Sequence, residues 1–276
     1  MKSTPFVRTE RTNLFQQTRR TRRGSRLTAF LGLLILAAAI PGVPDARADQ
    51  RRFAYSYEAT TMPKGMWEFE NWFTWKHYGH KDRFDFRHEI EYGITDRLQI
   101  ALYLADWRHE EFEDGGSKTR YRNTAVEVIY NLTDPINDPL GTALYGEVKL
   151  GDQKFALEGK LLAQKDLGPW SLIYNFTIES EWEGDDLGHL DEVKGEFKNS
   201  AGISYQLAPS FFLGAEILHE FELEDWKHRG PHSLFVGPNL SYRKGPFFVT
   251  VAGLIETLDA DGAAESQLRA LVGINF

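Results

Sequence analysis

Hydrophobic and polar residues alternate along most of the chain beyond residue 65. In residues 98–106, leucine or isoleucine occupies positions 98, 100, 102 and 104, and Gln99, Ala101 and Tyr103 lie between them. A period of two is typical of a β-strand with one apolar face. Runs of this kind, about ten residues long and closed by Gly, Pro or Asp, are the signature of transmembrane strands. We therefore expect a series of long antiparallel strands.

Division of the chain at its turn signals predicts twelve strands, an even number as in bacterial single-chain barrels. They cover residues 66–78, 83–92, 98–107, 120–130, 142–150, 154–164, 170–181, 193–205, 211–222, 233–242, 247–257 and 266–276. No apolar run after residue 48 is long enough to cross a bilayer as a helix. A closed barrel also satisfies its backbone in lipid, so the predicted fold class is all-β, an antiparallel transmembrane β-barrel. The alternative is a secreted soluble all-β protein.

The connections between these strands also follow a pattern. If the first strand runs outward, the periplasmic connections are residues 93–97, 131–141, 165–169, 206–210 and 243–246, and all but the second are tight. The other set includes residues 110–119, 182–192, 223–232 and 258–265, which are longer and acidic. Short periplasmic turns and longer external loops are typical of bacterial barrels, although the connections around residues 79–82 and 151–153 are short.

The N-terminal residues have the layout of a secretory signal peptide. Arginines at positions 19 to 26 precede an apolar stretch over residues 27–40, and Ala46 and Ala48 form a small-x-small cleavage site. We expect residues 1–48 to be a signal peptide, residues 49–65 a periplasmic N-terminal lead, and residues 66–276 the barrel. The expected location is the cell outer membrane.

The charge balance excludes some classes of partner. Cleavage after Ala48 removes nine basic and two acidic residues and leaves 228 residues with a net charge of −15. Nucleic-acid binding needs a basic face, so it is not expected. There is no cysteine, so an exported chain would use no disulfides. The expected partners are outer-membrane lipid and lipopolysaccharide, the barrel-assembly machinery, and small solutes.

The face opposite the apolar one is rich in charged side chains, which would line the lumen. The residues assigned to it are Glu68, Glu70, Arg87, Glu89, Glu91, Glu127, Glu147, Lys149, Glu179, Glu196, Glu216 and Arg269. Two interpretations remain open. An excess of carboxylates could line a water-filled path that favours cations, or the charges could pair across neighbouring strands and fill a narrow barrel.

An enzyme is not expected, because no motif brings a nucleophile and a base together. His88 and His219 fall on the predicted lipid face, and Ser233 follows His232 at the start of a strand. His77 and His80 could bind a metal but are more simply a solvated pair, so neither a metal nor a cofactor is expected.

Two segments resemble known outer-membrane proteins. The last strand is amphipathic and ends in Phe276, which resembles the signal by which barrels are recognised for insertion. The segment Met62-Pro63-Lys64-Gly65-Met66 and the Glu-aromatic alternation after it resemble the opening of uncharacterised proteobacterial outer-membrane barrels. Those proteins in turn resemble the MetA-type barrels, which are named after a phenol-degradation pathway. The resemblance implies an outer-membrane barrel and brings no catalytic residues.

From the sequence we expect passive transport of small solutes through a lumen with both charge signs and an excess of acids. The alternatives are a lipid-acting enzyme, of the phospholipase or lipid A deacylase type, and a closed structural barrel.

Overall fold

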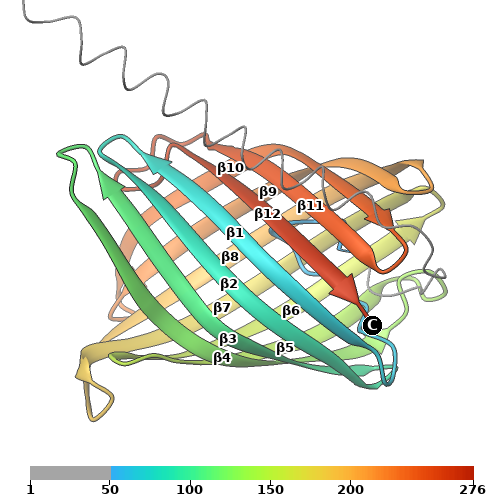
Figure 1. Ribbon diagram of the computed structural model, residues 1–276, viewed down its shortest axis with the longest axis horizontal. Coiled ribbons are helices and arrows are strands. Elements are labelled where there is room, and N and C mark those ends of the chain that lie inside the picture. Colours follow the sequence, from blue (N-terminus) through green and yellow to red (C-terminus); the bar gives the residue numbers. More distant parts are fainter. Residues whose placement is uncertain (1–50) are drawn as a thin grey trace, which may run out of the picture. The chain divides into compact units, whose positions relative to one another are not determined.

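A computed structural model describes residues 51–276 of the chain. These residues form twelve antiparallel strands that close into a barrel, in which each strand pairs with its neighbours in sequence and β1 pairs with β12 (Figure 1). The strands are β1 (Trp67–Tyr78), β2 (Lys81–Thr95), β3 (Leu98–Phe112), β4 (Ser117–Thr133), β5 (Gly141–Leu150), β6 (Lys154–Leu167), β7 (Trp170–Asp186), β8 (His189–Ala208), β9 (Phe211–Glu224), β10 (His228–Lys244), β11 (Phe247–Glu256) and β12 (Ser266–Asn275). Within residues 51–276, no helix is long and apolar enough to cross a membrane.

The predicted fold class is confirmed, and the number of strands with it. The period of two fits the closed barrel, because alternate side chains of each strand face the outside and the lumen. Leu102, Leu104, Val126 and Val128 are at least 40% exposed on the outside. Glu89, Glu91 and Glu127 are fully buried. The side chains that would be hidden in a soluble protein are therefore the exposed ones, as in a barrel that faces lipid.

The two ends of the barrel differ. We call the end where β1 begins and β12 ends the turn end, and the opposite end the loop end. At the turn end, aromatic pairs join neighbouring strands, each with one exposed and one half-buried ring, and the ring centroids are 4.4 Å apart for Trp67–Tyr92, 4.6 Å for Trp170–Tyr205 and 4.7 Å for Phe211–Tyr242. Such a girdle is typical of one membrane–water interface.

The strands at the loop end are longer than the sequence pattern predicts. Only residues 113–116 separate β3 from β4, and residues 187 and 188 separate β7 from β8. The expectation of long loops there is wrong for these hairpins. The extended ends are charged, and Glu110 of β3 is 2.9 Å from Lys81 and 3.2 Å from Arg120 on the two neighbouring strands. Opposite charges on adjacent strands stabilise strand pairing without any apolar face. The alternation of apolar and polar residues therefore does not reveal these extended strand ends.

The last residue takes part in closing the barrel. The N–H of Phe276 donates to the carbonyl of Trp67, and the N–H of Trp67 donates to the carbonyl of Phe276, each at 2.9 Å. In Figure 1, β1 and β12 lie side by side up to the C-terminus. The role of Phe276 as an insertion signal stays a prediction.

The segment before β1 lies inside the barrel, and this differs from the periplasmic lead expected for residues 49–65. Arg51 to Ala59 are all at most 8% exposed, and Met62 is fully buried. In Figure 1 this segment passes within the ring of strands. We call residues 51–62 the plug. The predicted signal peptide, with Ala46 and Ala48, lies outside the described residues.

Candidate functional site

The plug enters the lumen at the turn end through a tight turn. The N–H of Met66 donates to the carbonyl of Pro63 at 3.1 Å, and Gly65 has a φ of +83°. Glycine adopts this left-handed conformation without the strain that a Cβ atom brings. Asp96, in the connection between β2 and β3, accepts hydrogen bonds from the N–H of Lys64 and the hydroxyl of Thr61, both at 3.0 Å. The turn therefore fixes where the plug enters.

Amide side chains of four strands hold the backbone of the plug. Gln99 accepts from the N–H of Met62 at 2.7 Å, and Gln164 accepts from the N–H of Ala59 at 2.8 Å. Asn131 donates to the carbonyl of Ala59, and Asn175 forms hydrogen bonds with both backbone groups of Tyr57. Buried backbone groups need such partners, because an unpaired one is costly. Asparagine and glutamine at these interior positions thus replace the water that a free segment would bind.

Glu216 of β9 binds the next part of the plug. Its carboxylate accepts the backbone N–H groups of Ala54, Tyr55 and Ser56 at 2.7, 2.8 and 3.1 Å. Asn239 of β10 donates to this carboxylate and to the carbonyl of Arg52. A carboxylate that accepts three N–H groups makes strong, charge-assisted hydrogen bonds.

Arg51 and Arg52 form ion pairs with the barrel, and Arg52 also pairs within the plug. The guanidinium of Arg51 is 3.0 Å from Glu70 and 3.4 Å from Glu91. Arg52 is 3.0 Å from Glu58 and 3.2 Å from Asp166. Burial alone would lower the pKa of Arg52, but Glu58 and Asp166 outweigh it and raise the pKa above its ordinary value. Both arginines therefore remain charged and neutralise part of an acidic region.

The same region contains a cluster of carboxylates. Oxygen atoms of Glu68, Glu70 and Glu91 lie within 4.8 Å of one another, and all three residues are buried. Three such oxygens could bind a divalent cation. The guanidinium of Arg51 contacts two of them, so a cation there would compete with the plug.

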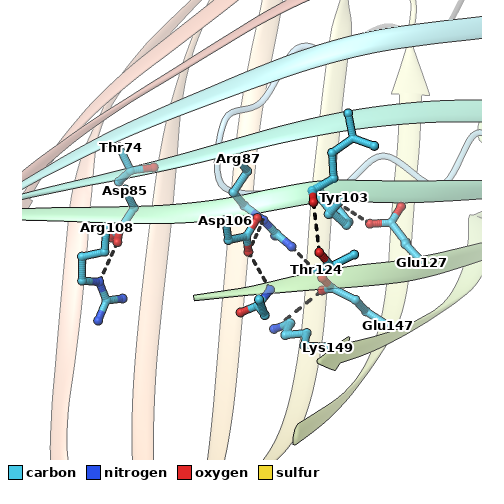
Figure 2. A network of polar contacts seen from close by, with 12 residues as sticks. Thr74, Asp85, Arg87, Tyr103, Asp106, Arg108, Thr124, Glu127, Glu147 and Lys149 are labelled. Atoms are coloured by element: carbon cyan, nitrogen blue, oxygen red, sulfur yellow. Dashed lines mark hydrogen bonds and ion pairs between the residues drawn. The ribbon is translucent and has the colours of Figure 1, made fainter. Parts of the chain in front are cut away.

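A layer of aromatic and charged side chains crosses the middle of the lumen. The hydroxyl groups of Tyr57 and Tyr103 are 3.1 Å apart, and the ring of Tyr57 meets the edge of Tyr145 at 5.0 Å. Figure 2 shows Tyr103 directed at Glu127, and Arg87 between Asp106 and Glu147. Arg87 also lies over the ring of Tyr103, 3.7 Å from its centroid. Burial raises the pKa of the Tyr57 phenol, so the layer contains a neutral hydroxyl at pH 7.

The structure places the residues predicted to line the lumen on its inner side. The glutamates at 68, 70, 89, 91, 127 and 216 are fully buried, Glu147 and Glu179 nearly so, and Arg87, Lys149, Glu196 and Arg269 are partly buried. Many of them pair, as in the contacts of Lys149 with Glu158 at 2.8 Å and with Glu179 at 3.1 Å. The sequence pattern missed Arg83, Arg108, Arg122 and Lys154, which lie near or beyond the predicted strand ends.

Beyond the middle layer, the lumen widens toward the loop end into a cavity of about 330 Å³. We call it the vestibule. Ten lysine or arginine residues and seven aspartate or glutamate residues line it. At the turn end the balance is reversed, because eight buried glutamates (58, 68, 70, 89, 91, 127, 147 and 216) are accompanied by the plug residues Arg51 and Arg52. The interior is therefore acidic at one end and basic at the other.

The side chains considered for catalysis do not converge. Ser233 faces inward opposite Glu220, while His219 and His232 are on the other face, with ring centroids 6.2 Å apart. A serine nucleophile requires a base within hydrogen-bond distance. His77 contacts Asp82 at 2.7 Å rather than His80.

The fold and the polar interior define a barrel of the outer-membrane type. A family model matches residues 45–270, and the chain belongs to this family of unknown function, DUF6662. Among curated proteins none matches.

Several solved structures are similar in fold. An outer membrane channel from Pseudomonas putida F1 superimposes with a TM-score of 0.56 at 13% identity, over 79% of this chain and 98% of that chain. The KdgM porin, solved in complex with disordered oligogalacturonate, gives 0.47 at 11% identity, over 76% and 98%. The translocator domain of the autotransporter NalP from Neisseria meningitidis gives 0.48 at 10% identity, over 77% and 88%. At such identities the likeness concerns the fold.

Proposed function

We propose that this chain is an outer-membrane channel for the passive passage of small solutes, closed in the state described here by its own N-terminal plug. The observation that supports the proposal is the interior itself. A barrel with a cavity lined by charged side chains provides the polar surroundings that a hydrated solute needs. A closed structural barrel would need no such cavity.

The way the plug is held supports a reversible closure. It contacts the barrel through hydrogen bonds and ion pairs, including those of Glu216 and Arg51, and through buried side chains such as Tyr57 against Trp72, and it is not a strand of the sheet. Water can replace the polar contacts when the plug leaves, because polar groups exchange protein partners for water at modest net cost. The barrel wall stays intact in that exchange.

The location and partners are part of the proposal. The turn end faces the periplasm, since short turns and both chain ends lie there in bacterial barrels. Membrane lipid and lipopolysaccharide then surround the apolar outside, and the barrel-assembly machinery inserts the chain. The kinship with MetA-type barrels suggested by residues 62–66 stays a prediction.

Planar-bilayer recordings test the channel directly. We expect the mature chain to conduct weakly or intermittently, and a variant without residues 51–62 to form stable, severalfold larger pores, because the plug fills the turn half of the lumen. The larger pore should prefer cations, since removal of Arg51 and Arg52 exposes the carboxylates there.

Matched variants separate an effect of charge on the cation preference from an effect on folding. Glu89→Gln with Glu91→Gln in the plug-free chain should reduce the cation preference, whereas Lys118→Gln at an exposed loop-end site should not change it. If neither form of the chain conducts, the channel is excluded and the closed structural barrel remains. Mass spectrometry of phospholipid and lipid A incubated with the protein tests the enzyme alternative.

A further inference from the structure

The vestibule has a feature that the channel proposal does not use, namely a net positive charge: ten cations and seven carboxylates line it, and two more carboxylates, Glu147 and Glu183, pair with its cations from outside the lining. The described chain supplies no carboxylate for some of these cations. Within residues 51–276, no carboxylate lies within the ion-pair distance of 4.0 Å from Lys76 or from Arg269. Arg269 instead donates to the hydroxyl of Thr74 at 3.0 Å and to the carbonyl of Ala54 at 3.3 Å.

Three arginines of neighbouring strands belong to this excess, and Arg83 of β2 is the cross-strand partner of Lys76. Arg83 and Arg108 share one carboxylate, that of Asp85, each at 2.7 Å. Figure 2 shows Asp85 beside Arg108. Arg122 is 3.8 Å from Glu183, a distance that leaves it only loosely paired. One carboxylate shared by two guanidinium groups leaves a net positive charge at this place.

Two carboxylates, Asp85 and Glu220, lie within electrostatic range of Lys76, and Lys198 is paired with Glu196 at 2.8 Å. Glu220 of β9 is within electrostatic range of Lys76, Lys198 and Arg269. In the described chain, no ion pair within 4.0 Å joins Glu220 to any of them. Space therefore remains between the charged groups, in a cavity large enough for a small molecule.

The floor of the vestibule is aromatic. The guanidinium of Arg269 lies over Tyr55 of the plug at 4.2 Å and over Trp72 of β1 at 5.4 Å. Both aromatic residues line the cavity and are less than 10% exposed. A site with cationic walls above an aromatic floor matches a molecule that carries an acidic group on a small ring or chain.

We infer that the vestibule binds small organic anions, with a carboxylate near Lys76 and Arg269 and the apolar part of the molecule toward Tyr55 and Trp72. The inference rests on the proposed function in that it names the class of solute that enters the channel. The anion binding inferred for the vestibule differs from the cation preference expected from the acidic residues of the turn half. The two halves act at different points of the path, and a solute from outside meets the basic half first.

Isothermal titration calorimetry of the refolded mature chain in detergent tests the site without any need for conduction. The probes are benzoate, acetate and inorganic phosphate, with benzyl alcohol as the neutral counterpart of benzoate and benzylamine as its cationic counterpart. Benzoate should bind at least about tenfold more tightly than benzyl alcohol, and its affinity should fall as NaCl rises from low to physiological concentration. Tighter binding of phosphate than of either carboxylate would assign the site to phosphate esters and overturn the carboxylate assignment.

Two substitutions should move the affinity for benzoate in opposite directions. Lys76→Gln should weaken it about fivefold, and Glu220→Gln should strengthen it by a similar factor, because each changes one charge beside the bound anion. Lys118→Gln, which removes an exposed lysine outside the vestibule, should leave it unchanged. A general loss of folding cannot produce two opposite shifts, and the salt dependence of the unmodified chain needs no variant.

Equal affinities for benzoate and benzyl alcohol, or an affinity independent of salt, would overturn the inference. If the protein conducts in bilayers but does not bind anions, the vestibule site is rejected and the channel stands. If it binds benzoate but never conducts, the channel is rejected and the anion site remains.

Discussion

At the scale of single residues, the interior of this barrel is organised by groups that satisfy the plug. Gln99, Gln164 and Asn175 offer amides, and Glu216 offers a carboxylate, each to a backbone group of the plug. Polar side chains on an inner strand face are expected of any water-filled barrel. Here they have a second use, because each replaces a water molecule with a fixed partner.

Glu216 should be the most sensitive of these positions. Glu216→Ala removes the acceptor of three N–H groups, and a lost hydrogen bond to a charged group costs about 1.5–3 kcal/mol. We expect the amides of Ala54, Tyr55 and Ser56 to exchange hydrogen for deuterium at least about tenfold faster, as measured by mass spectrometry. Glu216→Gln retains an acceptor and should give a smaller increase. Unchanged exchange in the alanine variant would show that Glu216 does not hold the plug.

At the scale of elements, strand positions followed closely from alternation, but the course of the plug did not. The inner and outer faces of β3 are evident from residues 98–106, where every second residue is leucine or isoleucine. Residues 51–62 have no such period, and their partners are spread along the chain, from Glu70, 19 positions away from Arg51, to Glu216, 162 positions away from Ala54. The sequence contains one signal that was not used, since the adjacent Arg51 and Arg52 come shortly before a run of glutamates on the inner face of β1 and β2.

The strand ends at the loop end were missed for a related reason. Arg108 of β3 lies beyond the predicted strand 98–107, at the start of the stretch 108–111 that is polar on both faces. Arg122 and Lys154 lie within predicted strands but near their ends, and they were not assigned to the lumen. Strands that leave the membrane lose the apolar face that reveals them. The basic character of the vestibule was therefore hidden, and the acidic turn half dominated the lumen predicted from the sequence.

The contact between the plug and β8 can be tested by steric exclusion. A Cβ atom on Gly202 would lie 2.6 Å from the ring of Phe53, closer than real contacts allow. Gly202→Val should therefore displace Phe53 and loosen the plug, so that trypsin cleaves after Arg52, which is only 8% exposed in the described state. N-terminal sequencing would identify a fragment that begins at Phe53. Gly146→Val is the matched control, since a Cβ there meets nothing within 4 Å. Equal resistance of both variants to trypsin would contradict this packing.

At the scale of the whole molecule, charge separates along the barrel axis. The turn half contains buried glutamates neutralised in part by the plug, and the vestibule has more cations than anions. A solute that crosses the lumen would thus meet fields of opposite sign in sequence. Such an arrangement slows ions of either charge and favours a solute that is held at the basic end and released when the plug moves.

The orientation of this axis in the membrane can be measured because the chain has no cysteine. Glu113→Cys introduces a thiol at the loop end, and Ile136→Cys introduces one at the turn end, where the native side chain is 67% exposed. A membrane-impermeant maleimide applied to intact cells should label the first variant only, and both after solubilisation in detergent. Labelling of the second variant alone in intact cells would reverse the proposed orientation.

The position of the plug has a consequence for the order of assembly. Residues 51–62 leave the ribosome before any strand, yet their hydrogen-bond partners belong to eight strands from β3 to β12, and Arg51 also contacts β1 and β2. We therefore expect the segment made first to reach its final position last, after the wall that surrounds it has formed. Until then the barrel would lack its plug and would have a turn end lined by glutamates, so that each molecule would pass once through an open state on its way to the closed one.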